Sequence, residues 1–243
     1  MSLQEFYDNK YRAGEELQKT SKIYTLSLFA DLEKSKVLDI GCGAGINSVE
    51  IAKKGHEVIG IDISHIAVEK YCANGFEGKV MDISKKIDFD DNSFDVVFLS
   101  EVIEHVTDPS YLVQEIYRIL KSGGKLILST PNSSFWVYRI GSLFGYTVSE
   151  LQHPKHFVFF SIRSLTKILL NSGFNIERQF GRNMYLILPD IKFHFLKKLL
   201  IFLGFKSEVR FRTKKIFWHL SNKSKVLNSI FADTTIILAQ KPK

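Results

Sequence analysis

A glycine-rich turn between an apolar run and a helical stretch constrains the fold of this chain more than any other feature. Residues 37–40 are apolar apart from one acid, Asp39, which is typical of a buried strand. Gly41, Gly43 and Gly45 follow, and glycine permits both a tight turn and close approach of the backbone to a ligand. The next residues have helical spacing. A crossover of this kind places a ligand at the carboxyl edge of a parallel sheet, facing free amide groups.

Strand-like and helix-like stretches alternate along most of the chain, which predicts an α/β fold with a doubly wound, mostly parallel sheet. The last two expected strands flank a long basic segment, so we expect the final strand to be antiparallel. The expected sheet has seven strands, at residues 37–40, 57–62, 78–81, 94–99, 125–129, 174–180 and 233–240.

The expected domain organisation is a helical N-terminal segment followed by one α/β domain. Residues 1–32 are predicted either to pack on the domain or to form a lid over its pocket, and the domain spans residues 33–243. Two insertions interrupt it. Residues 133–160 are rich in aromatics and are expected on the substrate side, whereas residues 189–231 are basic and aromatic.

The net charge of +7 is concentrated in the second insertion. Residues 189–231 contain ten Lys and Arg against two acids and therefore carry +8, which leaves −1 for the rest of the chain. Residues 191–205 place most large apolar side chains on one helical face. This pattern fits a helix packed on the sheet edge, and it equally fits contact of residues 191–218 with an anionic membrane surface. Nucleic acid ranks third, because no RNA-binding module is visible.

Cysteine usage and the lack of long apolar runs favour a cytoplasmic protein. Cys42 and Cys72 form neither a disulfide framework nor a C-x-x-C metal site, which predicts a reducing compartment. Residues 1–22 are polar and contain no apolar signal region. No run reaches the roughly 18 apolar residues of a membrane span. We therefore expect a cytoplasmic location, with peripheral attachment to the cytoplasmic membrane face as an alternative.

Four motifs resemble those of the class I S-adenosylmethionine-dependent methyltransferases. The G-x-G-x-G turn departs from the G-x-G-x-x-G of dinucleotide sites, and with Asp39 in the strand it is similar to the first motif of that family. The other three motifs are residues 60–64, 93–106 and 120–127. All four lie in order within residues 35–132, which implies a Rossmann-like methyltransferase domain. Within the family, residues 101–106 and 153–157 most resemble the O-methyltransferases of ubiquinone biosynthesis.

The resemblance implies a binding site for S-adenosylmethionine and for its product, S-adenosylhomocysteine. Asp39 would hold the methionine ammonium, directly or through water. Asp62, at the end of the second strand, would accept hydrogen bonds from both ribose hydroxyls; an N-cap role is the alternative. The expected cofactor-binding residues are Asp39, Gly41, Cys42, Gly43, Gly45, Asp62, Ile63, Asp82, Ile83, Ser100, Tyr11 and Arg12.

Methyl transfer to a hydroxyl needs alignment of the reacting atoms and a base for the hydroxyl proton. The candidates are Glu101 and His105 after the fourth strand, and His153 and His156 in the first insertion. A structural role for His105 is equally open. Glu101 and His105 could also hold a metal ion with a third ligand, but the sequence offers no compact ligand cluster, so we expect no metal.

The expected activity is O-methylation of a small or lipid-linked hydroxylated acceptor, such as a quinone precursor or a glycan. Two rivals stay open: a non-catalytic member that binds the cofactor and acts through a protein partner, and a nucleic-acid methyltransferase that uses the basic insertion. Methylation of amino groups on adenine or glutamine is disfavoured, because no (D/N)-P-P-(Y/F) motif follows the fourth strand. Neither cysteine follows the fourth or fifth strand, so a covalent pyrimidine mechanism lacks a nucleophile.

Overall fold

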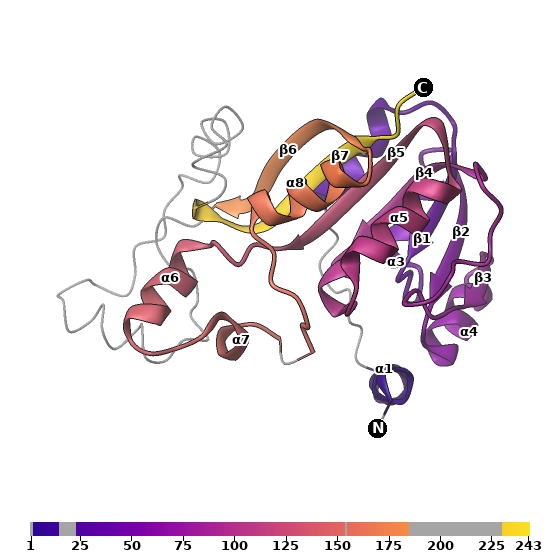
Figure 1. Ribbon diagram of the computed structural model, residues 1–243. Coiled ribbons are helices and arrows are strands. Elements are labelled where there is room, and N and C mark those ends of the chain that lie inside the picture. Colours follow the sequence, from indigo (N-terminus) through magenta and orange to yellow (C-terminus); the bar gives the residue numbers. More distant parts are fainter. Residues whose placement is uncertain (1, 15–22, 154, 185–229) are drawn as a thin grey trace.

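A computed structural model describes residues 2–14, 23–153, 155–184 and 230–243, and within them one seven-stranded sheet carries helices on both faces (Figure 1). The strand order is β3-β2-β1-β4-β5-β7-β6, and β7 is antiparallel to both of its neighbours. The remaining neighbouring pairs are parallel. These observations confirm the predicted doubly wound sheet with an antiparallel last strand. The strands are β1 Lys36–Ile40, β2 Glu57–Asp62, β3 Glu77–Val80, β4 Phe94–Ser100, β5 Leu120–Pro131, β6 Asn175–Met184 and β7 Ala232–Gln240.

Several helices begin at residues whose side chains cap them, and these residues are recognisable in the sequence. Asp108 accepts a hydrogen bond from the Tyr111 amide at the start of α5, and Pro109 occupies the first helical position. Ser64 caps α4 through the Ala67 amide. The described helical elements are α1 Leu3–Arg12, α2 Ile23–Ser27, η1 Leu28–Asp31, α3 Ile46–Ala52, α4 His65–Ala73, η2 Ile103–His105, α5 Pro109–Ile119, α6 Trp136–Leu143, α7 Val148–Leu151 and α8 Ile162–Asn171.

Two apolar clusters, one on each face, hold the sheet between its helices. One contains side chains of α5 and α8 packed against β1, β4 and β5. The other contains side chains of α2, η1 and α3 packed against β1, β2 and β7. Central β4 alternates between the two clusters: Val97 and Leu99 face the first, whereas Val96 and Phe98 face the second. This two-sided burial explains why the strand is apolar along nearly its whole length.

The strand expected at residues 125–129 begins earlier, at Leu120. Leu120 pairs with Phe94, and the pairing resumes at Lys125 with Val96 after a shift in register. A side chain at Gly124 would lie 2.8 Å from the Lys121 carbonyl oxygen. Residues 121–124, which include the glycine pair, therefore form a bulge inside one continuous strand, which is longer than expected.

The two ends of the first insertion are joined to each other, and its base is attached to the sheet. The Ser133 amide donates to the Phe160 carbonyl at 2.8 Å and so closes the insertion at its base. The Asn132 amide donates to the Asp233 carbonyl at 2.8 Å and ties that base to β7. Helices α6 and α7 lie within this insertion, beside the main body of the domain (Figure 1).

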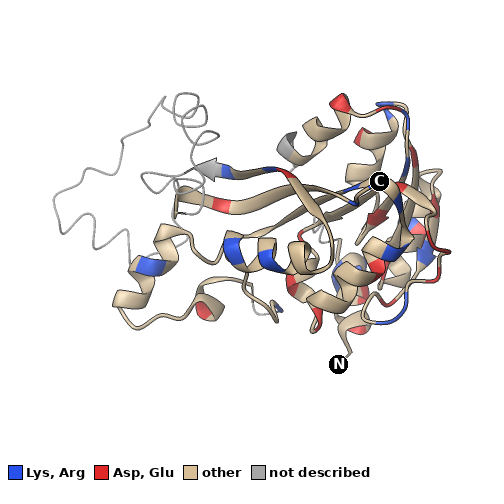
Figure 2. Ribbon diagram, turned by 45° about the horizontal axis from the view of Figure 1, so that its top comes forward, with Lys and Arg blue, Asp and Glu red and all other residues tan. Residues whose placement is uncertain are grey.

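Nearly all of the second insertion lies outside the described residues. Acidic and basic residues are interspersed along the rest of the ribbon (Figure 2), in keeping with the small net charge that the sequence leaves there. Among the described helices, none combines the length and the apolarity that a membrane crossing requires.

Candidate active site

A cavity of about 730 Å³ opens at the carboxyl ends of β1, β2 and β4. Strand β1 lies between β2 and β4, so the strand order runs outward from β1 in both directions. Ligands of doubly wound sheets bind at such a switch point in the strand order. Helix α1 and the first insertion complete the wall. The cavity brings together eleven of the expected site residues: Tyr11, Gly41, Asp62, Ile63, Asp82, Ile83, Ser100, Glu101, His105, His153 and His156.

Five of the expected cofactor-binding residues do not line this cavity, namely Asp39, Cys42, Gly43, Gly45 and Arg12. Asp39 and Cys42 are buried beneath the turn, and burial raises the pKa of the Cys42 thiol far above its ordinary value. Arg12 is exposed and donates to Asn9 Oδ1 at 3.3 Å.

Asp62 fixes the glycine turn through its carboxylate. Oδ2 accepts a hydrogen bond from the Gly43 amide at 3.0 Å, and Oδ1 accepts one from the Ser64 amide at 2.9 Å. Burial raises the pKa of Asp62, and these backbone hydrogen bonds act against that rise. The sequence posed ribose binding and helix capping as alternatives for this acid. In the structure Ser64 caps α4, and Asp62 joins the cap to the turn while lining the cavity.

The glycine turn requires its glycines for two physical reasons. Gly41 and Gly45 have φ angles of 72° and 91°, which side-chain-bearing residues rarely adopt. A side chain at Gly41 would also lie 2.4 Å from Val102 Cγ2. The turn can therefore keep its path along the cavity wall only with glycine at these positions.

The loop after β3 carries Asp82 and Ile83, two of the expected cofactor-binding residues. Asp82 accepts hydrogen bonds from the Ser84 amide and hydroxyl at 3.0 and 2.6 Å, and it lies 3.4 Å from Lys85 Nζ. Burial acts to raise the pKa of Asp82, but the contacts with Ser84 and Lys85 outweigh it and lower the pKa. Asp82 therefore stays ionised and can accept a hydrogen bond from an amino group.

Helix α1 is attached to α4 along the side of the cavity. Asp8 Oδ1 accepts hydrogen bonds from Ser64 Oγ at 2.5 Å and from the Ile66 amide at 3.3 Å. Lys70 Nζ donates to the Tyr11 carbonyl at 2.8 Å. These contacts place two α1 residues, Tyr7 and Tyr11, in the cavity wall. The sequence gave no pattern that would pair Asp8 with residues almost sixty positions away.

Glu101 occupies a strained position directly after β4. Its φ angle is +58°, a region that few residues other than glycine adopt. The Glu101 amide donates to the Ser129 carbonyl at 2.8 Å, and Ser129 Oγ donates to Glu101 Oε1 at 3.0 Å. Strain of this kind persists only where the surroundings hold it, and it is common at functional sites. The bonds to β5 hold Glu101 at the edge of the cavity.

Three histidines from two distant segments meet in the cavity wall. The ring centroid of His105 lies 4.8 Å from that of His156 and 6.0 Å from that of His153. Tyr7 of α1 also approaches His105, with centroids 6.1 Å apart. The sequence named these histidines as separate candidates. The structure places them in one cluster.

Hydrogen bonds set the tautomers of two of these rings. His105 Nδ1 lies 2.9 Å from the Lys155 carbonyl oxygen, which can only accept, so Nδ1 carries the proton and Nε2 presents a lone pair. The Lys155 amide donates to His153 Nδ1 at 3.2 Å, so in the neutral His153 ring the proton lies on Nε2. His105 is thus suited to act as a base or a metal ligand through Nε2, whereas neutral His153 offers a donor there.

Glu104 completes this cluster, and the sequence did not predict its role. Its side chain is 2% exposed, and Oε2 accepts a hydrogen bond from Thr130 Oγ1 at 2.9 Å. The Glu104 carbonyl accepts the amides of Phe157 and Val158 at 2.8 and 3.2 Å, which fixes the insertion beside it. The pattern Glu-x-x-Glu-His at residues 101–105 was the available indication.

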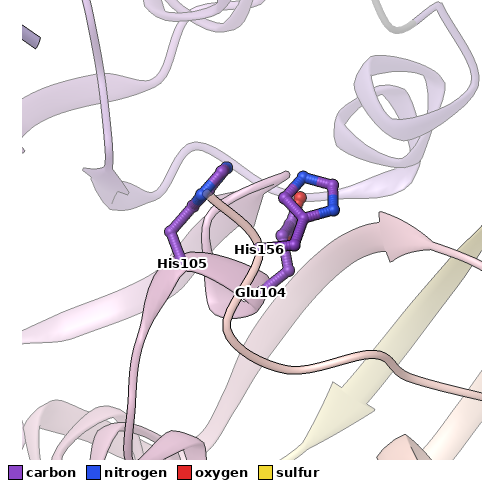
Figure 3. A group of neighbouring side chains, drawn as sticks. All are labelled: Glu104, His105 and His156. Atoms are coloured by element: carbon purple, nitrogen blue, oxygen red, sulfur yellow. The ribbon is translucent and has the colours of Figure 1, made fainter. Parts of the chain in front are cut away.

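Glu104, His105 and His156 together could hold a metal ion. One ligand atom from each residue lies within 4.8 Å of the others, and the three side chains gather between η2 and the insertion (Figure 3). One carboxylate and two imidazoles suit a divalent cation of the first transition series. The sequence offered no compact ligand cluster and paired Glu101 with His105. In the structure Glu104 takes the place of Glu101 in this group, and His156 comes from a segment some fifty residues away.

We expect this cluster to make stability depend on pH. Burial and the neighbouring charges of His105 and His153 lower the pKa of His156 to about 4. The unfolded chain therefore binds more protons than the folded one between about pH 6.5 and pH 4, so stability falls as pH falls through that window. From pH 7 to pH 5 the melting temperature should drop by several degrees more in the wild type than in His156→Gln. Equal drops, measured by circular dichroism, would contradict this assignment.

Comparison with protein families identifies the class to which this fold and site belong. The family model described as "Methyltransferase domain" matches residues 7–179. The chain therefore belongs to the methyltransferase domain family, and the resemblance to S-adenosylmethionine-dependent methyltransferases is confirmed.

Curated relatives share part of the chain. It is 35% identical over 115 residues to a protein of Alkalilimnicola ehrlichii named ubiquinone biosynthesis O-methyltransferase, a match that covers 45% of this chain and 47% of the relative. It is 30% identical over 159 residues to the human mitochondrial protein of that name, which covers 60% of this chain and 43% of the relative. The matches span less than half the length of these relatives.

Solved structures share the fold over nearly the whole chain. A protein of Archaeoglobus fulgidus, titled SAM-dependent methyltransferase, superposes with a TM-score of 0.60 at 22% identity, covering 95% of this chain and 99% of that one. The structure titled [4+2]-cyclase SpnF gives a TM-score of 0.63 at 19% identity, covering 99% and 96%. At these identities the likeness shows the fold alone, and the two titles illustrate that this fold carries more than one reaction.

Proposed function

We propose that this protein transfers the methyl group of S-adenosylmethionine to a hydroxyl group of an apolar acceptor. The observation that carries the proposal is the continuity of one cavity. The acids Asp62 and Asp82 and the cluster of Glu104, His105 and His156 all line this cavity. The first two have the chemistry that holds a nucleoside, and the cluster has the chemistry that removes a hydroxyl proton.

The reaction is an in-line displacement on a methyl group that the sulfonium charge has already activated. The protein must align the three reacting atoms, exclude water and accept one proton. Nε2 of His105 is placed for that last task, and burial lowers the pKa of His105, so the ring is neutral near pH 7. Ser100, at the end of β4, lines the cavity and is our candidate for lining the sulfonium.

A bound divalent cation is a second way to activate the hydroxyl. Glu104, His105 and His156 would hold it, and the cation would lower the pKa of an acceptor hydroxyl that binds to it. On this proposal chelation with EDTA should lower turnover at least tenfold, and Mn²⁺ or Zn²⁺ should restore it. Unchanged turnover after exhaustive chelation would leave His105 acting as the base without a metal.

The acceptor class rests on the relatives and on the cavity wall. Relatives named for ubiquinone biosynthesis suggest a hydroxylated ring. Apolar residues such as Val102, Val106 and Phe157 line the cavity near the histidine cluster, which suits an apolar acceptor. We propose a small or lipid-linked hydroxylated molecule, with a quinone precursor or a lipid-carried glycan as the two chemical types.

The donor and the acceptor can be tested separately. Calorimetry with S-adenosylhomocysteine tests the donor site, and no binding at millimolar ligand would reject the proposal. Turnover of labelled methyl donor against hydroxylated quinone precursors, sugars and lipid-linked glycans tests the acceptor. Binding without turnover on the whole panel would favour the non-catalytic alternative.

A membrane partner is proposed for the basic insertion on the ground of its sequence alone. Residues 191–218 lie outside the described residues, so the support is the +8 charge and the interleaved aromatic side chains of residues 189–231. Co-flotation of the protein with anionic liposomes at low salt would support it. Equal recovery with neutral and anionic liposomes would reject it, and retention on polynucleotide instead would favour the nucleic-acid alternative.

A further inference from the structure

One buried ring makes contact with three of the glycines near the turn. Tyr71 of α4 is 0% exposed. A side chain at Gly60 of β2 would lie 2.4 Å from Tyr71 Cζ, and one at Gly78 of β3 would lie 2.8 Å from Tyr71 Cδ1. At Gly45, in the turn itself, the corresponding distance to Tyr71 Cδ2 is 3.0 Å. Three backbone segments thus approach one another around this ring, so its position is closely fixed.

The hydroxyl of this ring begins a buried chain of hydrogen bonds. Tyr71 donates to Ser48 Oγ at 3.0 Å, and Ser48 donates to Asp39 Oδ2 at 2.6 Å. All three residues are buried. Each donor in such a chain strengthens the next, and the last bond is charge-assisted because its acceptor is a carboxylate. The chain therefore fixes the Asp39 carboxylate directly before the glycine turn.

Two further observations connect this chain to the cavity. Asn74, one residue past α4, donates from Nδ2 to the Ala44 carbonyl at 2.9 Å, so α4 supports the turn at a second point. Burial is the main cause that raises the pKa of Tyr11 in the cavity wall, and the charges of Asp62 and Asp39 add to it. The charge of Asp39 therefore acts on the cavity although its side chain lies beneath the turn.

We propose that Tyr71 and Ser48 are positioning residues that orient Asp39 toward the ammonium group of the donor's amino-acid portion. This inference rests on the proposed use of S-adenosylmethionine. The two residues do not touch the ligand and act only through Asp39. Loss of either hydrogen bond should weaken recognition of the amino-acid portion and leave recognition of the nucleoside portion intact.

Two ligands separate this role from simple packing. S-adenosylhomocysteine carries the ammonium group, whereas 5′-methylthioadenosine has the same nucleoside and sulfur without the amino-acid portion. In Ser48→Ala we expect the Kd of S-adenosylhomocysteine to rise about tenfold, because this variant loses a charge-assisted hydrogen bond to Asp39. In Tyr71→Phe we expect a rise of about threefold, because the lost hydrogen bond joins two neutral groups. The Kd of 5′-methylthioadenosine should change by less than twofold in both variants.

The outcomes are distinguishable. Equal weakening of both ligands, or no change in either, would overturn the inference, because only a role through Asp39 separates them. Failure of the wild type to bind S-adenosylhomocysteine would reject the proposed function instead. Tyr71→Phe keeps the ring among the glycines, so we expect this variant to fold even if Ser48→Ala does not. Circular dichroism checks the fold of both variants. Tyr117→Phe, on α5 and packed against Phe174, is the matched control and should change neither Kd.

Discussion

Replacement of Asp62 with alanine is expected to weaken binding of S-adenosylhomocysteine at least about 100-fold. The carboxylate accepts hydrogen bonds from the amides of Gly43 and Ser64, and on the proposed function it also accepts the ribose hydroxyls. Hydrogen bonds to a charged group contribute about 1.5–3 kcal/mol each. Loss of the two bonds from the ribose hydroxyls should therefore raise the dissociation constant at least about 100-fold. Asp62→Asn keeps one acceptor oxygen and should lie between the wild type and Asp62→Ala. Calorimetry gives the three dissociation constants.

The control for this prediction is Asp95→Asn. Asp95 is an acid at the start of β4, at the opposite end of the strand from the cavity, and it accepts hydrogen bonds from the Lys36 amide and Lys121 Nζ. The control should bind S-adenosylhomocysteine as the wild type does. A dissociation constant for Asp62→Ala within threefold of the wild type, in a protein with a native circular dichroism spectrum, would contradict the assignment of Asp62 to the ribose.

Replacement of Glu104 with glutamine is expected to lower methyl transfer at least about 100-fold without changing the affinity for S-adenosylhomocysteine. Glutamine has the same shape and can still accept the hydrogen bond from Thr130. The substitution removes a negative charge that stabilises either a bound cation or the imidazolium that forms when His105 takes the proton. Loss of one such electrostatic contact typically costs a factor of about 10²–10³ in kcat.

Metal binding separates the two explanations for that loss. If a cation is used, titration with Mn²⁺ should show a site in the wild type that Glu104→Gln lacks. If His105 acts alone, the wild type and the variant should bind Mn²⁺ equally weakly while turnover still falls. Glu177→Gln, an exposed acid on β6 paired with Lys125, is the matched control. Turnover of Glu104→Gln equal to that of Glu177→Gln would exclude Glu104 from the reaction.

Most of the sheet could be predicted because its determinants are local. The apolar runs of β1, β2 and β4 and the caps of α4 and α5 lie within a few residues of the structure that they specify. The G-x-G-x-G spacing with an acid before it resembles the first motif of the methyltransferase family, and that resemblance indicated the ligand class. The boundaries of β5 were missed, because the bulge depends on pairing with Phe94 some 26 residues away.

The candidate acceptor site could be predicted only as separate residues. His105 and His156 were both candidates, but the tautomer of His105 and the distance between the two rings follow from contacts with the insertion. Glu104 was not a candidate, because neither its burial nor its position beside His156 is visible in the sequence.

The sequence by itself determined the order of the strands and helices and the chemistry of the glycine turn, because hydrophobic periodicity, caps and glycine spacing act over short distances along the chain. Only the tertiary structure decided which polar groups meet. Asp8 with Ser64, His105 with Lys155, and Asp39 with Tyr71 through Ser48 are contacts of residues 32 to 56 positions apart, made where the sheet and its crossovers bring the segments together. The physical reason is that side-chain pairing across a fold depends on packing, which no local pattern encodes.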